Sequence, residues 1–198
     1  MAKAEFGRGR IEAFSDGVIA IIVTIMVLEL HLPETALEGD LWTQLVLPLA
    51  PKLFGYALSF LVVAIMWVNH NALMDTVRRV DSAVMWLNLN LLFWMSLIPL
   101  VTGFWGDHPF DAPAVAAYGF ILFASSAAFT LFRRHLITQE TESAELAALH
   151  QRVMRKSLVG VALYGVSTPL AWASPWISLA IFAIVPAMFF IPDLKEME

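Results

Sequence analysis

The chain has 198 residues, of which 59% are hydrophobic and 15% are charged, and its mean hydropathy is +0.72. Soluble domains are typically about 45–50% apolar and about 25% charged, so this composition excludes a soluble globular protein. The net charge of −5 decides little by itself, and the absence of cysteine excludes disulfides and thiolate chemistry.

The apolar residues fall into six blocks, most of them close to the roughly 20 residues that a membrane-spanning helix needs. The blocks cover about 13–32, 50–70, 84–105, 113–132, 157–173 and 176–192. The last two are short and separated only by residues 173–175, so they could instead form a helical hairpin that does not cross fully. The expected fold is a single domain, 1–198, an all-α integral membrane protein with six transmembrane helices.

The positions of the charges predict the topology. All of the twelve Lys and Arg residues except Lys52 lie before block one, between blocks two and three, between four and five, or after six. Cytoplasmic loops carry the excess of Lys and Arg, so both termini are expected in the cytoplasm. The basic start followed by an apolar run is also typical of a signal peptide. Asp16 inside that run, and the lack of a small-x-small site before Pro33, favour a retained span.

The stretch 10–30, which contains most of the first block, carries unusual polarity for a spanning helix, because Arg10, Glu12, Ser15 and Asp16 lie in its first two turns. A charged residue in a span costs about 2.5–3.5 kcal/mol and marks a functional or network site. The candidate partners at the end of the second block and in the third are Trp67, Asn69, His70, Asn71, Asn88 and Asn90. Two interpretations stay open: a buried polar network that joins three helices, or a proton relay that uses Asp16 and His70.

Beyond this polar start, the first block presents an aliphatic face. At about 100° per residue, Leu28 lies within about 20° of Ile21 and Ile25 within about 40°, while Thr24 lies about 60° to the other side. Asp16 points elsewhere, about 140° away. Copies of this helix around an axis would stack rings of aliphatic side chains, which can gate a pore by excluding water. Lipid contact or ordinary packing would explain the same pattern.

Other kinds of site find little support. Residues 101–106, VTGFWG, faintly resemble a carbonyl filter, but they end a hydrophobic span and have no re-entrant pore helix before them. The sequence shows no metal-ligand spacing, no nucleophile with a base and no Gly-rich phosphate loop. The basic loops satisfy the topology and require no nucleic-acid partner. The expectation is therefore no enzyme and no bound metal.

Two motifs are similar to a known family. Arg10-x-x-x-Phe14-Ser15-Asp16 at the start of the first of six spans resembles the signature of the transmembrane protein 175 family, the lysosomal potassium channel and its prokaryotic relatives. Trp67-x-Asn69-His70 also resembles the second span of that family, although Asn71 stands where another His is expected. The resemblance covers the whole chain in length and topology.

The resemblance implies a potassium-preferring cation channel in the cell membrane of a prokaryote. It implies a homotetramer in the lipid bilayer, with the first helix of each subunit lining a central pore, and no cofactor beyond the permeant potassium ion. By position, the pore constriction maps onto Ile21, Ile25 and Leu28, and a selectivity threonine maps onto Thr24. The intrasubunit polar network implied by the family comprises Arg10, Phe14, Ser15, Asp16, Trp67, Asn69 and His70.

Three functions are therefore compared. The first is a potassium-preferring leak channel without a carbonyl filter, in which partial dehydration at aliphatic rings and the Thr24 hydroxyl discriminate between cations. The second is a proton-coupled secondary transporter that uses a buried Asp16 and His70 network, although the paired repeats of many carriers are not evident. The third, a membrane enzyme or assembly factor, lacks any catalytic constellation.

Overall fold

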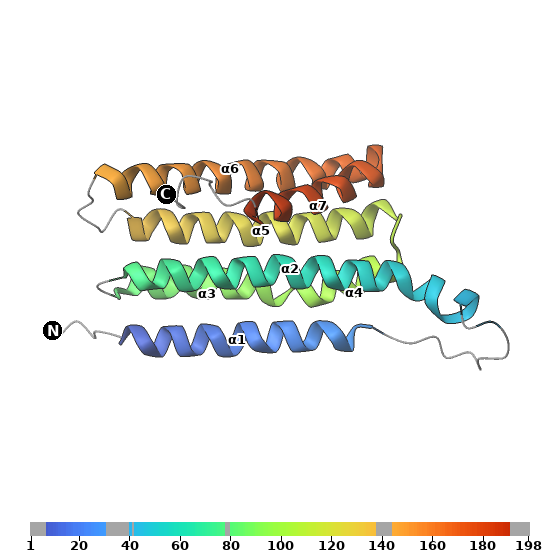
Figure 1. Ribbon diagram of the computed structural model, residues 1–198, viewed down its shortest axis with the longest axis horizontal. Coiled ribbons are helices and arrows are strands. Elements are labelled where there is room, and N and C mark those ends of the chain that lie inside the picture. Colours follow the sequence, from blue (N-terminus) through green and yellow to red (C-terminus); the bar gives the residue numbers. More distant parts are fainter. Residues whose placement is uncertain (1–6, 31–39, 41, 78–79, 138–143, 191–198) are drawn as a thin grey trace.

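The computed structural model describes residues 7–30, 40, 42–77, 80–137 and 144–190, and the regular elements in these ranges are helices (Figure 1). In chain order the elements are α1 (Arg8–Leu28), the π-helical η1 (Trp42–Val46), α2 (Leu47–Thr76), α3 (Ser82–Ser96), α4 (Ile98–Asp107), α5 (Ala112–Ile137), α6 (Ala144–Ala173) and α7 (Pro175–Phe190).

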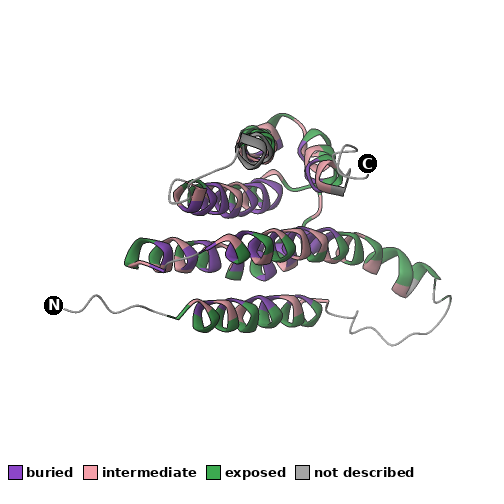
Figure 2. Ribbon diagram, turned by 60° about the vertical axis from the view of Figure 1, so that its left-hand side comes forward, coloured by how far each residue is buried: buried purple, intermediate pink, exposed green. Residues whose placement is uncertain are grey.

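The helices run up and down in a bundle of three layers. The first layer is α1 alone, the second is α2 with α3 and α4, and the third is α5 with α6 and α7 (Figures 1 and 2). The first helix packs against α2, α3 and α4. Its opposite side is exposed along most of its length (Figure 2). The position of α1 at the edge of the bundle leaves one complete helix face without a partner inside the subunit.

Each predicted apolar block overlaps a helix, although block one, 13–32, extends beyond the end of α1 at Leu28, and residues 31–32 and 191–192 lie outside the described ranges. Among the described residues, four stretches are long and apolar enough to cross a membrane: Arg8–Leu28, Leu47–Thr76, Ser82–Asp107 and Ala112–Ile137. The apolar part of α7, Pro175–Phe189, is shorter. The chain is thus an all-helical, multi-pass membrane protein. Block five lies within the 30-residue α6, whereas block six falls on the short α7.

The predicted third block, 84–105, is one span built from two helices. Helix α3 begins at Ser82 and is capped by Asp81, whose side chain accepts a hydrogen bond from the backbone N–H of Val84 at 2.8 Å, a standard N-cap. The break comes at Leu97, just before Pro99, which lacks the N–H that would continue the helical ladder. Buried contacts hold the two pieces in line, because Met95 and Ile98 are both fully buried.

Small residues bring the C-terminal helices close together. A Cβ at Gly119 of α5 would lie 3.1 Å from the Phe182 ring of α7 and 3.1 Å from the Ser167 Oγ of α6. The Ser178 hydroxyl of α7 donates to the Ser167 carbonyl at 2.7 Å. Close approach of backbones at small residues is a usual way for membrane helices to associate. It fixes α7 against both α5 and α6.

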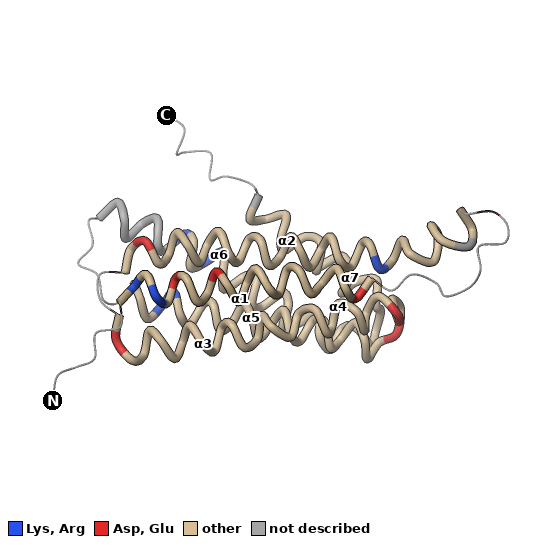
Figure 3. Tube along the Cα trace, turned by 90° about the horizontal axis from the view of Figure 1, so that it is seen from below, with Lys and Arg blue, Asp and Glu red and all other residues tan. Residues whose placement is uncertain are grey.

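The charged side chains are distributed unevenly between the two ends of the bundle. Lys and Arg gather at the end where α1 begins and α5 ends, whereas Lys52 lies at the opposite end, where acidic residues collect (Figure 3). There Lys52 Nζ pairs with Asp107 Oδ1 at 2.6 Å. The charge distribution that predicted the topology from the sequence is therefore present in three dimensions at the two ends of one bundle.

Candidate functional site

Helix α1 divides into a packed face and a free face. Its packed face consists of Ile11, Ser15, Ile19, Ile22 and Met26, all buried. The side chains of Ile21, Ile25 and Leu28 are 58%, 41% and 71% exposed, respectively. They are thus available for contacts outside the subunit, as both a pore wall and a lipid-facing surface require.

Thr24 lies on the same free face and is exposed. Its hydroxyl donates to the Ile21 carbonyl oxygen at 2.9 Å. Because this bond uses the hydroxyl hydrogen, the lone pairs of Thr24 Oγ1 are left to accept hydrogen bonds or to contact a cation. A ring of such oxygens would be a polar step between aliphatic side chains.

The packed face of α1 carries one buried chain of polar side chains. Asn88 Nδ2 of α3 donates to Ser15 Oγ of α1 at 2.9 Å, and Asn88 Oδ1 accepts from His70 Nε2 of α2 at 2.8 Å. An amide oxygen only accepts, so Nε2 of His70 carries the proton. The His70 ring also stacks on Phe132 of α5, with centroids 5.8 Å apart. These contacts join four helices at one level of the bundle.

Asp16 is not part of this buried chain. Its carboxylate accepts a hydrogen bond from the indole N–H of Trp67, with Oδ1 and Nε1 2.9 Å apart, and both residues are exposed. His70 is buried and bonded to Asn88. The expected cluster is therefore split, with Asp16 and Trp67 toward the outside and Ser15, Asn88 and His70 inside.

The structure places the other predicted network residues elsewhere. Asn69 lies about 160° around α2 from Trp67, and its Oδ1 accepts from Arg133 Nη2 of α5 at 3.2 Å. Phe14 is exposed. Arg10 is also exposed, and in the described part of the chain its guanidinium has no hydrogen-bond or ion-pair partner. The arginine that connects α1 to α2 is Arg8.

The Arg8 contacts were not expected from the sequence. Its guanidinium pairs with Glu12 at 2.6 Å on the same helix and with Asp75 at 2.5 Å at the end of α2. The spacing of Arg8 and Glu12, four residues apart on a helix, was the available signal. Asp75 is far away in the sequence, and only the packing of α2 beside α1 brings it into reach.

A second buried polar cluster was also missed. Ser59 Oγ of α2 lies 2.7 Å from Thr102 Oγ1 of α4 and 2.9 Å from the Tyr118 hydroxyl of α5. From the sequence, these hydroxyl groups cannot be told apart from Ser and Thr hydroxyls that bond only to a backbone carbonyl of their own helix. Together with the Ser15, Asn88 and His70 chain, this cluster joins the α1–α4 layers to α5.

Comparisons with known proteins agree with this architecture. The profile of the family described as the endosomal/lysosomal potassium channel TMEM175 matches residues 10–99. A potassium channel of a Chryseobacterium species is 39% identical over 189 residues, covering 95% of each chain. A potassium channel of Chamaesiphon minutus is 31% identical over 188 residues, covering 92% of each chain.

A solved structure extends the similarity to three dimensions. The crystal structure of a lysosomal potassium-selective channel TMEM175 homologue from Chamaesiphon minutus superposes with a TM-score of 0.78, at 28% identity, covering 92% of this chain and 95% of that one. The fold and these relatives define the class as all-helical, multi-pass membrane channels. More narrowly, the chain belongs to the TMEM175 family.

Proposed function

We propose that this protein is a potassium-preferring cation channel in which the free face of α1 lines the ion path. Two relatives that match almost the whole chain are described as potassium channels. The observation that carries the proposal is the free face of α1, which exposes Ile21, Ile25 and Leu28 while its opposite face anchors the helix in the subunit.

The centre of this free face favours helix contact over simple lipid contact. Opposite the buried stripe lie Ala13, Gly17, Ala20 and Thr24, all exposed. A Cβ added at Gly17 would meet no atom within 4 Å. Small residues let membrane helices approach closely, so copies of α1 can converge around an axis with aliphatic side chains beside them. A homotetramer, as the family resemblance implies, is the assembly that we propose.

Discrimination among cations would arise without a carbonyl filter. A ring of aliphatic side chains repels water, so an ion must shed part of its hydration shell to pass. Potassium holds its water less tightly than sodium, and the Thr24 hydroxyl oxygens would replace some of the lost contacts. The expected outcome is modest potassium preference, with Ile21, Ile25 and Leu28 forming the constriction and gate.

The remaining elements of the proposal concern topology and location. Six spans, with both termini in the cytoplasm of a prokaryotic cell and the channel in its plasma membrane, satisfy the observed charge distribution. The basic end of the bundle would face the cytoplasm. Helices α6 and α7 would be the fifth and sixth transmembrane spans. Helix α7 is short, but its apolar composition suits a span.

The proton-coupled transporter is not favoured. That function needs Asp16 and His70 to exchange a proton, but Asp16 bonds to Trp67 on the exposed side while His70 bonds to Asn88 in the interior. The relatives described above are channels rather than carriers. The polar groups are therefore better explained as the anchor that sets the orientation of α1.

The direct test is ion flux in liposomes. Purified protein should produce a potassium diffusion potential larger than the one produced by an equal sodium gradient. Ile21→Asn and Leu28→Asn should raise conductance or hold the pore open, because polar side chains allow water into the constriction. Ile184→Asn is the matched control, since Ile184 on α7 is 55% exposed, close to Ile21.

Two results would contradict the proposal. Unchanged conductance in both α1 variants would place the ion path elsewhere. A monomer by native mass measurement in a detergent that preserves flux would remove the shared axis on which the rings depend.

A further inference from the structure

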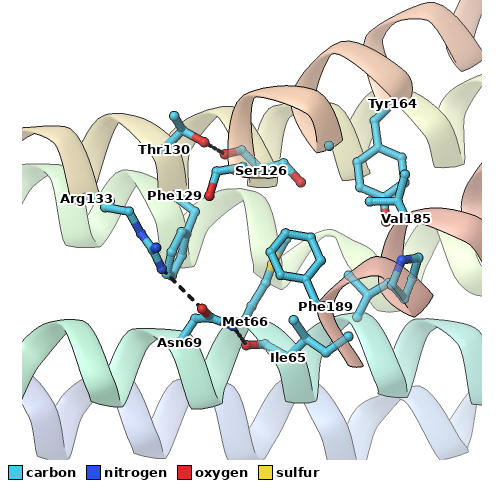
Figure 4. Close-up of a pocket in the computed structure, with 14 residues that line it drawn as sticks. Ile65, Met66, Asn69, Ser126, Phe129, Thr130, Arg133, Tyr164, Val185 and Phe189 are labelled. Carbon is cyan, nitrogen blue, oxygen red and sulfur yellow. Dashed lines mark hydrogen bonds between the residues drawn. The ribbon is translucent and has the colours of Figure 1, made fainter. Parts of the chain in front are cut away.

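A narrow crevice that is open on one side lies between α2 and the three C-terminal helices α5, α6 and α7 (Figure 4), and the space between its walls, counted with the open solvent at its mouth, is about 510 Å³. Much of its wall is apolar, with side chains from α2, α5 and α7, namely Ile65, Met66, Phe129, Val185, Pro186 and Phe189. It is separate from the free face of α1, which lies on the other side of the α2 layer (Figure 1). The matched family profile, residues 10–99, covers only its α2 wall.

The crevice contains a buried cation. Arg133 of α5 is only 7% exposed. Its guanidinium reaches toward α2, where Nη2 donates to Asn69 Oδ1 at 3.2 Å, and it lies 5.1 Å from the centroid of the Phe129 ring (Figure 4). Its Nε is buried and has no hydrogen-bond partner among the described residues. Among the residues that the structure describes, no carboxylate forms an ion pair with Arg133.

A buried guanidinium with one neutral partner is an incomplete arrangement. Charged groups removed from water are normally paired, because the desolvation cost must be offset. An amide oxygen and an aromatic face satisfy Arg133 only in part. The guanidinium presents five N–H donors in a planar fork that suits a phosphate group well.

The depth of Arg133 in the bundle fits a lipid headgroup. It lies four residues before the end of α5 at Ile137, which is about 6 Å along the helix axis. This is the end where Lys and Arg gather (Figure 3). Phe189, which lines the crevice, also has Lys156 Nζ of α6 5.8 Å from the centroid of its ring. Basic pockets between transmembrane helices on this side of a membrane bind anionic headgroups.

We propose that this crevice binds one anionic phospholipid per subunit, with its phosphate on Arg133 and an acyl chain along the apolar wall. The apolar lining is the reason to prefer a phospholipid over free phosphate, which has no use for it. A phosphate oxygen would accept a hydrogen bond from the unpaired Nε–H of Arg133, and the phosphate would compete with Asn69 Oδ1 for the other guanidinium donors. Asn69 lies between Trp67 and His70 in the sequence. A bound lipid would therefore contact the part of α2 whose side chains anchor α1.

The test is native mass spectrometry of the full chain with phosphatidylglycerol, phosphatidylcholine or inorganic phosphate. The wild type should retain one phosphatidylglycerol per chain, at least about tenfold in preference to phosphatidylcholine. Arg133→Gln should abolish this preference. Arg134→Gln is the matched control, because Arg134 is the next residue but is exposed, and the preference should survive.

A second variant guards against misfolding of Arg133→Gln. Ser126→Leu fills the crevice while Arg133 stays in place, and it should also abolish retention of phosphatidylglycerol with an unchanged helical circular-dichroism spectrum. Equal retention of the two lipids by the wild type, or equal losses in Arg133→Gln and Arg134→Gln, would overturn the site. Arg133-dependent binding of inorganic phosphate without lipid preference would overturn the lipid as its ligand. None of these readouts depends on ion conduction.

Discussion

The indole of Trp67 on α2 donates a hydrogen bond to the Asp16 carboxylate on α1, with Nε1 and Oδ1 2.9 Å apart. Ser15, the neighbour of Asp16, points inward and accepts from Asn88 on α3. Adjacent residues of α1 thus bond to two different helices. These two bonds set the rotation of α1 about its own axis. That rotation leaves Ile21, Ile25 and Leu28 on the free face of the helix.

Trp67→Phe removes the indole donor and keeps an aromatic ring. We expect the free energy of unfolding to fall by about 1 kcal/mol, because the bond is charge-assisted but exposed. Chemical unfolding in mixed micelles, followed by circular dichroism, measures the change. Trp86→Phe is the control, since Trp86 is 68% exposed and has no hydrogen-bond partner in the described ranges. Equal effects of the two substitutions would show that the Asp16 bond contributes nothing specific.

Asn88→Leu should be more destabilising than Trp67→Phe. It breaks two buried hydrogen bonds and leaves Ser15 Oγ and His70 Nε2 without their partner. The expected loss is about 1–3 kcal/mol, because two interhelical hydrogen bonds are lost and each contributes about 0.6–1.7 kcal/mol in a membrane protein. Asn90→Leu is the matched control, since Asn90 lies on the same helix and is exposed. A loss for Asn90→Leu as large as for Asn88→Leu would argue against the buried chain.

Tyr118→Phe tests the second polar cluster. The Tyr118 hydroxyl bonds to Ser59 Oγ at 2.9 Å, but Ser59 keeps Thr102 as a partner at 2.7 Å. We therefore expect a loss of only about 0.5–1 kcal/mol in unfolding free energy. Tyr56→Phe, at a half-buried position on α2, serves as the comparison. A loss above that of Asn88→Leu would mean that this cluster, rather than the α1 anchor, dominates helix association.

Thr24→Val tests the selectivity proposed for the free face of α1. The substitution keeps the shape and removes the hydroxyl oxygen, so the ratio of potassium to sodium permeability should fall roughly two- to tenfold while conduction persists. Reversal potentials in planar bilayers measure the ratio. Thr43→Val, at an exposed threonine in η1, should leave it unchanged. An unaltered ratio in Thr24→Val would assign selectivity to the aliphatic rings alone.

Ile21→Asn, proposed above for liposome flux, has a second expected outcome. Because Ile21 is 58% exposed on the subunit, the substitution should change the unfolding free energy of a dissociated subunit by less than about 0.5 kcal/mol. Mixed-micelle unfolding at dilution measures it, with Ile19→Asn as the buried counterpart. A loss for Ile21→Asn that matches Ile19→Asn would place Ile21 inside the subunit.

The sequence determined the kind of molecule and the positions of its helices. Apolar length and the distribution of Lys and Arg act locally, so the six apolar blocks and the basic end of the bundle follow from residue type and spacing. The pattern of Ile21, Ile25 and Leu28 likewise follows from the helical repeat. The family resemblance rested on residues that are close together in the chain, and it is confirmed.

Only the tertiary structure decided which polar groups meet. From the sequence, Asp16, Asn69 and His70 are expected in one polar network, but each of them points in a different direction from its helix. The orientation of α2 about its own axis brings Trp67 into contact with α1, His70 with α3 and Asn69 with Arg133 on α5. Helix rotation is set by the packing of all neighbours at once, and no local pattern encodes it.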